Sequence, residues 1–223
     1  MNENCWLKNN CNHKDCDKIC KRYNILDYMY SNANIPLDKR ADKKLVLDGD
    51  KIDLESYTRL KNVENDIINF VKNGTNLYIY SNMTGNGKTE WSYKLLRAYI
   101  NKTWTKNGLK VTSMFISVPK LLGCLKNNLG NNDEYATHFL ENVYNTDLIV
   151  WDDLATKTMT SFEGESMLTY IDGRLSNNKS NIYTSNISPN ELIEIVGDRL
   201  YSRIINTSIP IEFKGADKRG LIL

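Results

Sequence analysis

The chain has 223 residues, 41% of them hydrophobic and 25% charged, which is the composition of a soluble globular protein. Its formal net charge of +2 excludes nucleic-acid binding through a strong overall charge, so any such contact needs a local basic patch. No apolar run is long enough to cross a membrane, and the N-terminus lacks the basic and apolar regions of a signal peptide. We therefore expect a cytoplasmic protein with reduced thiols and no membrane contact.

Four of the five cysteines lie in the first 20 residues: Cys5, Cys11, Cys16 and Cys20, with His13 among them. In a reducing compartment this clustering favours a metal site, and four thiolates can surround one Zn²⁺. The spacing C-x5-C-x4-C-x3-C is not that of a paired zinc ribbon, and His13 can replace any one cysteine. The alternatives are an iron–sulfur cluster and a tail with chance cysteines.

Residues 21–34 are expected to form a helix with one apolar side, made of Tyr23, Leu26, Met29 and Tyr30. This apolar side either docks a partner or packs against the rest of the chain. The mostly polar stretch that follows reads as a linker. The predicted organisation is an N-terminal cysteine-rich module with its helix over 1–34, a linker over 35–53, and a main domain over 54–223.

The main domain alternates helices and strands, which predicts an α/β fold with a central five-stranded parallel sheet. Helices are expected over 54–72, 88–101, 120–129, 133–144, 163–175, 189–195 and 199–205. Strands are expected over 77–80, 112–117, 147–151, 181–184 and 208–213.

The stretch 77–90 predicts a phosphate-binding loop, because a short apolar strand is followed by a glycine turn and Gly87-Lys88-Thr89 at the start of a helix. Backbone N–H groups and the positive helix end favour an anion there, Lys88 would reach the phosphates and the Thr89 hydroxyl would bind Mg²⁺. The first glycine of the motif is replaced by Asn82, a residue type that tolerates left-handed backbone angles. The predicted ATP-binding residues are Asn82, Thr84, Gly85, Asn86, Gly87, Lys88, Thr89 and Glu90.

Two acids follow the apolar strand 147–151, at the sheet edge where α/β proteins bind ligands. Asp152 is placed to hold Mg²⁺ together with Thr89. Asp153 is the candidate to orient and deprotonate the attacking water. Without the phosphate loop, the pair would read as an ordinary polar end of a strand.

Two further candidates lie later in the chain. Asn186 follows the strand 181–184 and either hydrogen-bonds the γ-phosphate or the water, or caps the next helix. Arg199 and Arg203 lie one helical turn apart and either stabilise transition-state charge, often on a neighbouring subunit's phosphate, or form solvated or intramolecular ion pairs.

These motifs come in an order that resembles an AAA+ ATPase of the DnaC/DnaI-type replicative helicase loaders, over roughly residues 30–223. The run from Gly85 to Thr89 resembles the Walker A motif, and Asp152-Asp153 resembles Walker B. Thr184-Ser185-Asn186 resembles sensor 1, and the run from Arg199 to Arg203 resembles the arginine-finger segment. Three further features fit the loaders: the run Ile171-Asp172-Gly173-Arg174, the N-terminal cysteines, and a chain ending that resembles the loaders' Gly-x-x-x-Arg and includes Arg219. The chain stops 10 residues after the last predicted strand, which leaves no room for a full helical lid and leaves the role of Arg219 open.

The resemblance implies an ATPase that uses ATP and Mg²⁺, forms a nucleotide-dependent homo-oligomer, binds a DnaB-type hexameric helicase through residues 1–34, and assists its loading on single-stranded DNA in replication initiation. Lys120 and Lys126 are candidate DNA contacts, or solvated lysines. Two alternatives are an IstB-type transposition helper and a nucleotide-binding helicase adaptor without turnover. An asparagine- and tyrosine-rich chain would suit a phage or mobile element.

Overall fold

The computed structural model describes residues 5–7, 11, 20–42, 45, 51–106, 108–127 and 133–217. Its helices are α1 (Lys21–Asn32), the 3-10 helix η2 (Leu37–Lys39), α2 (Leu54–Asn65), α3 (Ile67–Lys72), α4 (Lys88–Thr103), α5 (Val118–Asn127), α6 (Glu134–Asn142), α7 (Ser161–Ser176), α8 (Pro189–Val196) and α9 (Asp198–Ile205). Its strands are β1 (Asn76–Tyr80), β2 (Ser113–Ser117), β3 (Leu148–Asp152), β4 (Ser180–Ser185) and β5 (Ser208–Glu212). No helix within the described ranges combines the length and the apolar character that a membrane crossing requires.

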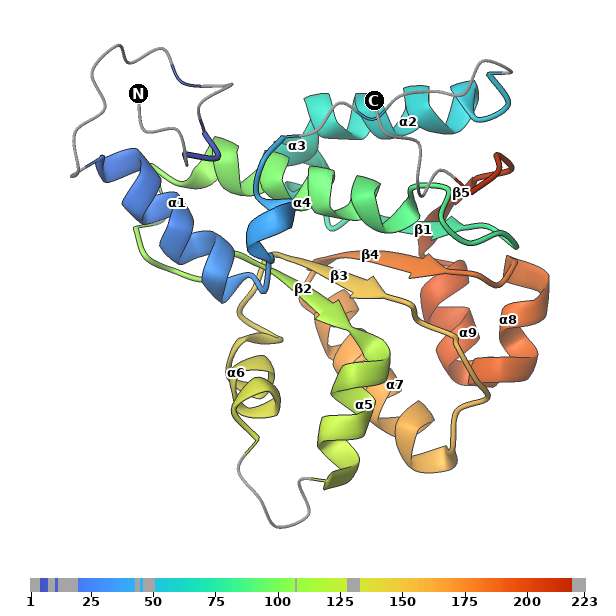
Figure 1. The fold of residues 1–223 in the computed structure, drawn as a ribbon. Helices are drawn as coiled ribbons and strands as arrows, with labels where there is room; N and C mark the ends of the chain where they lie inside the picture. The colour runs from blue at the N-terminus through green and yellow to red at the C-terminus, as the bar shows by residue number, and fades with distance from the viewer. Residues whose placement is uncertain are drawn as a thin grey trace.

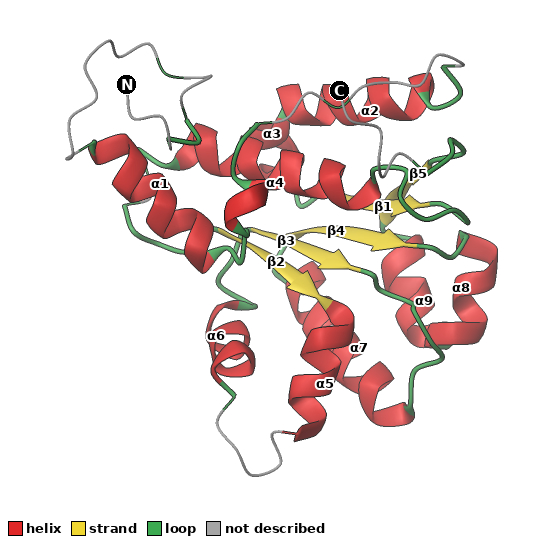
Figure 2. Ribbon diagram, viewed as in Figure 1, coloured by secondary structure: helices red, strands yellow, loops and turns green. Residues whose placement is uncertain are grey.

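The five strands form one parallel sheet in the order β2-β3-β4-β1-β5, which confirms the predicted α/β architecture (Figure 2). The central strands β3 and β4 are buried along their whole length, as expected for a parallel sheet covered on both faces. Because all strands run the same way, the loops after β1, β3 and β4 meet at one edge of the sheet.

Helices cover both faces of the sheet and create two apolar cores (Figure 1). Helices α1 to α4 lie on one face, where Leu77 and Ile79 of β1 point into the core. Helices α5 to α9 lie on the other face, where Tyr78 of β1 and Trp151 of β3 are buried. The alternation of side chains along β1 thus divides its residues between the two cores.

The predicted helix over 54–72 is wrong in one respect, because it is two helices. Asp66 ends α2 with non-helical backbone angles, φ −109° and ψ 28°, and α3 starts at the next residue. The Asp66 carboxylate accepts a hydrogen bond from the Asn69 side chain at 2.7 Å. Short polar side chains of this kind compete with the helical backbone, which explains the break.

The apolar side of α1 packs against the sheet domain, which confirms that alternative over an exposed docking face. Leu26 and Tyr30 are fully buried, Met29 is 4% exposed, and all three belong to the same core as β1 and α4. The Tyr30 hydroxyl donates to Asn101 Oδ1 of α4 at 3.2 Å. These side chains are therefore not available to a partner.

The chain after α1 also covers the outer edge of β2. The Phe115 N–H donates to the carbonyl of Ala33 at 2.8 Å, and Asn34 Nδ2 donates to the Phe115 carbonyl at 3.2 Å. Downstream, Arg40 is 6% exposed and its guanidinium donates to Asp27 and Ser31 of α1. Residues 20–42 are thus fastened to the sheet domain at several points.

The described residues do not support the predicted zinc site. Cys5, Cys11 and Cys20 are half-buried free cysteines, and no cluster of three metal-binding side chains occurs among the residues that the structure describes. Cys20 instead caps α1, since its Sγ accepts the Tyr23 N–H at 3.4 Å. Cys16 and His13 lie outside the described residues.

Candidate nucleotide site

The phosphate loop joins β1 to α4, as its sequence predicts. Gly85 and Gly87 have φ angles of 73° and 104°, so both use the left-handed freedom of glycine, and Gly87 is the N-cap of α4. The loop therefore brings its backbone N–H groups to the positive end of a helix of 16 residues, which is the arrangement that attracts phosphate.

Polar side chains inside the loop hold its shape. Asn86 is fully buried, and its Nδ2 donates to Ser81 Oγ at 2.6 Å. Ser81 Oγ also accepts the Met83 N–H at 3.1 Å. Lys88 Nζ donates to the Met83 carbonyl at 2.8 Å and to Asn86 Oδ1 at 3.2 Å. The lysine ammonium thus lies over the loop, where its charge would meet a bound phosphate.

Asn82 does not use the left-handed backbone that we expected of it. The described non-glycine residues with positive φ are Asn34, Lys51, Asp153 and Asn178, so Asn82 is not among them. Its side chain is exposed, as is that of Thr84. The first motif position thus accommodates a side chain here without backbone strain.

Glu90, the last of the predicted ATP-binding residues, forms an ion pair with Lys39 of η2. Both side chains are partly buried. The pair connects the N-terminal part of the chain to the first turn of α4, which carries Lys88 and Thr89.

Asp152 and Thr89 meet at the edge of the sheet. Thr89 Oγ1 donates to Asp152 Oδ1 at 3.0 Å, although 63 residues separate them. The two oxygen atoms suit Mg²⁺, because ligands on adjacent corners of its octahedron, each about 2.1 Å from the ion, lie about 3 Å apart. Burial raises the pKa of the Asp152 carboxyl to about 6; the hydrogen bond from Thr184 opposes this shift and the charge of Asp153 adds to it. A cation at this position would restore the ionised form.

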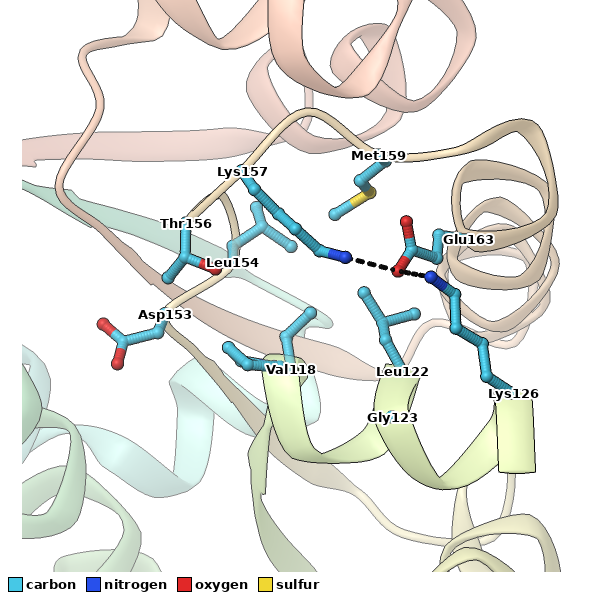
Figure 3. Close-up of a pocket in the computed structure, with 11 residues that line it drawn as sticks. Val118, Leu122, Gly123, Lys126, Asp153, Leu154, Thr156, Lys157, Met159 and Glu163 are labelled. Carbon is cyan, nitrogen blue, oxygen red and sulfur yellow. Dashed lines mark hydrogen bonds and ion pairs between the residues drawn. The ribbon is translucent and has the colours of Figure 1, made fainter. Parts of the chain in front are cut away.

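Asp153 turns away from the strand with a left-handed φ of 56°. It lines a pocket of about 110 Å³ between α5 and the loop from β3 to α7 (Figure 3). At the far side of this pocket Glu163, only 1% exposed, accepts Lys126 at 2.9 Å and Lys157 at 3.1 Å. Burial alone would raise the pKa of Glu163, but the hydrogen bonds from the Thr160 N–H and the two lysines lower it to about 2.

Asn186 follows β4 directly and is half-buried. Since β4 lies between β1 and β3, Asn186 leaves the sheet between the phosphate loop and the two acids. The alternative that Asn186 caps the next helix is wrong: Ser188 is the N-cap of α8, and its Oγ donates to Glu191 at 2.6 Å. The amide of Asn186 is therefore not used by the helix end.

The two candidate arginines lie on α9, across the sheet from α4 (Figure 1). Arg203 Nε donates to Asp172 of α7 at 2.5 Å, with both side chains about half exposed, so the intramolecular pair foreseen as an alternative is present. Arg199 is exposed, and none of the described residues pairs with it. Neither arginine is brought to the phosphate loop of its own chain.

The candidate DNA-contacting lysines are both engaged. Lys120 Nζ lies 4.2 Å from the centre of the Tyr135 ring, a cation–π contact, and Lys126 is bound to Glu163. Arg219 lies outside the described residues.

Sequence reasoning missed the roles of Thr184 and Arg174. In the sequence Thr184 is part of a Thr-Ser-Asn run, and no local pattern shows that its hydroxyl contacts Asp152 at 2.7 Å. Arg174 ends the Ile-Asp-Gly-Arg run before β4, and nothing in that run indicates burial. It is fully buried and donates to Asn181 and to the carbonyls of Val143, Thr146 and Ser180.

Comparison with known proteins finds similarity in structure only: neither the protein-family models nor the curated protein sequences include a match. A crystal structure of the DnaC helicase loader is 24% identical, with 82% of this chain and 99% of that chain covered and a TM-score of 0.57. A DnaI structure is 19% identical, with coverages of 82% and 94% and a TM-score of 0.59. Domain III of the Thermotoga maritima replication initiation protein DnaA is 19% identical, with coverages of 86% and 68% and a TM-score of 0.59. The chain therefore shares its fold with the DnaC and DnaI loaders and with domain III of DnaA.

Proposed function

We propose that this chain is an ATP-dependent replication-initiation factor of the helicase-loader type, which binds a DnaB-type hexameric helicase and assists its placement on single-stranded DNA. The observation that carries the proposal is the convergence of Lys88, Thr89, Asp152 and Asn186 at one sheet edge, in a chain with the fold of DnaC and DnaI. Known DnaA structures include one bound to AMPPCP and single-stranded DNA, which supports a nucleotide in this fold.

The chain's own groups divide the work of ATP hydrolysis. The loop N–H groups and Lys88 would bind and orient the phosphates, while Thr89 and Asp152 would hold Mg²⁺, which neutralises charge on the phosphate oxygens. Asp153 would accept the proton of the attacking water, and Asn186 would hydrogen-bond that water or the γ-phosphate. Arg199 or Arg203 would reach the phosphates only from a neighbouring subunit, because both lie across the sheet from their own α4. Hydrolysis would then depend on assembly.

We assign the helicase contact to the N-terminal region. Within it, residues 1–19 suit a partner better than α1 does, because the apolar side of α1 is buried. Whether its cysteines bind Zn²⁺ is a separate question, which zinc analysis of the full chain and of Cys16→Ser would answer. The division of the chain at residues 34 and 53 remains a prediction.

The test is co-purification of the full chain with a DnaB-type helicase, with and without ATP, followed by a helicase-loading assay on single-stranded DNA. We expect binding and loading by the wild type, and no loading by Lys88→Ala. The matched control is Lys61→Ala, which removes an ion-paired lysine of α2 far in sequence from the loop. Normal loading by Lys88→Ala would exclude nucleotide as the driver. Nucleotide binding without phosphate release would favour the adaptor, and equal binding to duplex and single strand without helicase affinity would favour the transposition helper.

A further inference from the structure

We propose that Thr184 is a positioning residue that aligns both acids, Asp152 and Asp153, for the metal-assisted step. This inference rests on the proposed function, since it concerns the same nucleotide site. Thr184 lies on β4, whereas the acids end β3, so the contact crosses between neighbouring strands.

One hydroxyl group contacts both acids. Thr184 Oγ1 donates to Asp152 Oδ1 at 2.7 Å, and the same oxygen accepts the Asp153 N–H at 3.1 Å. The Thr184 carbonyl accepts the next N–H, that of Leu154, at 2.9 Å. The end of β4 therefore holds three consecutive residues of the β3 edge.

The contact to Asp152 fixes which carboxylate oxygen is used. Thr184 is 1% exposed and Asp152 7%, so water contributes little to holding this carboxylate. Thr89 and Thr184 both donate to Oδ1, and no hydrogen bond from a described residue reaches Oδ2. The rotation of the carboxylate is thus set by two hydroxyls, which keeps Oδ1 within 3.0 Å of Thr89 Oγ1, the pair of oxygen atoms that suits Mg²⁺.

The contact to Asp153 fixes a costly backbone turn. A left-handed conformation is costly for a non-glycine residue, so it persists only where its surroundings hold it. Two hydrogen bonds to Thr184, one from the Asp153 N–H and one from the Leu154 N–H, hold Asp153 at its φ of 56°. The direction in which the Asp153 carboxylate leaves the sheet follows from this turn.

Valine has the shape of threonine without the hydroxyl, so Thr184→Val removes the bonds to Asp152 Oδ1 and to the Asp153 N–H while keeping the packing and the carbonyl bond to Leu154. Serine keeps the hydroxyl. Losing a group that orients a metal ligand weakens metal binding by about 10- to 100-fold. We expect the Mg²⁺ concentration that half-saturates nucleotide binding to rise by about that factor in Thr184→Val, and by no more than about threefold in Thr184→Ser.

The experiment titrates a fluorescent non-hydrolysable ATP analogue against the full chain across a range of Mg²⁺ concentrations. Thr103→Val is the matched control, because Thr103 is a buried threonine at the far end of α4 whose hydroxyl bonds the Tyr99 carbonyl. Thermal unfolding checks each variant, and Thr184→Ala replaces Thr184→Val if the latter does not fold. The inference is supported if the half-saturating Mg²⁺ concentration rises only in the variants that lack the Thr184 hydroxyl.

An unchanged Mg²⁺ dependence in Thr184→Val, or an equal rise in Thr103→Val, overturns it. These results differ from a failure of the proposed function. In that case the wild type itself would bind no nucleotide and would be indistinguishable from Lys88→Ala. That result would remove the basis of both proposals.

Discussion

Lys39 and Glu90 form an ion pair between η2 and the first turn of α4, one residue beyond Thr89. Their side chains are 26% and 30% exposed, so solvent screens the pair only in part. The backbone beside it is also fixed, because Arg97 of α4 donates to the Lys39 carbonyl at 2.5 Å. The segment that follows α1 therefore touches the phosphate-binding helix at its functional end.

Removing the lysine is expected to weaken nucleotide binding, because Glu90 would then present an uncompensated negative charge near the phosphates. For Lys39→Ala we expect a loss of about two- to fivefold in ATP affinity, corresponding to less than about 1 kcal/mol. Nucleotide titration at low and high salt measures it, and the loss should shrink at high salt.

The double variant Lys39→Ala/Glu90→Gln separates charge from packing, since it removes both members of the pair. It should recover most of the affinity. Equal affinities for the wild type and Lys39→Ala at low salt would show that the pair has no influence on the site.

Restoring the glycine of the phosphate-binding motif is expected to change little. Asn82 is exposed and lacks a positive φ, so Asn82→Gly relieves no strain and adds only the flexibility of glycine, about 0.4–1 kcal/mol. We expect ATP affinity within about fivefold of the wild type. A larger gain in the titration would mean that the Asn82 side chain obstructs the phosphates.

Neutralising Asp152 is expected to stabilise the protein without nucleotide while abolishing its Mg²⁺ dependence. The pKa of Asp152 is about 6 in the folded protein, against an ordinary value of 3.8. Ionising this carboxyl therefore lowers the free energy of unfolding in full above about pH 6, and the loss fades as pH falls towards 3.8. Asp152→Asn should therefore gain about 1–3 kcal/mol near pH 8 and less near pH 5 in urea unfolding. A gain that is the same at both pH values would contradict this assignment.

Replacing Arg174 is expected to unfold much of the population. Its guanidinium is fully buried and donates to four groups, the Asn181 side chain and the carbonyls of Val143, Thr146 and Ser180. Lysine keeps the charge but lacks the planar fork, so Arg174→Lys should leave buried acceptors unpaired and cost about 3–5 kcal/mol in urea unfolding.

Arg203→Ala is the matched control for this loss, since it breaks an arginine pair at the surface. It should cost less than about 1 kcal/mol. Similar losses for the two variants would refute the structural role assigned to Arg174.

The exposed arginine of α9 is expected to act on a neighbour. Arg199→Ala should lower ATP hydrolysis by the assembled protein by about 10³-fold or more, while nucleotide affinity of the separate chains stays unchanged. Mixing Arg199→Ala with Lys88→Ala chains should restore part of the hydrolysis, because some interfaces then combine an intact loop with an intact arginine. A mixture as inactive as its parents would argue against action between subunits.

Much of the fold could be predicted because local signals agree with the final structure. The apolar strand, the glycines and the Gly-Lys-Thr run place β1, the loop and α4 within one or two residues of their observed bounds. The break at Asp66 could not be predicted, because the apolar spacing continues across it.

The contacts within the site depend on which strands become neighbours. Thr184 and Asp152 are 32 residues apart, and only the placement of β4 beside β3 brings them together. The burial of the apolar side of α1 likewise depends on α4, against which it packs. Spacing along a sequence predicts which side a residue takes, but the partner comes from the topology.

Both outer strands of the sheet are interrupted as pairing edges in the part of the chain that the structure describes. At one side Ala33 and Asn34 occupy the hydrogen-bonding groups of Phe115, and at the other Pro210 leaves β5 without an N–H in mid-strand. Among the described residues neither outer strand offers a continuous edge to a second copy, so an assembly of copies would form through side chains on helices and loops. Contacts of that kind can be made and released as nucleotide comes and goes, whereas a shared sheet would tend to be permanent.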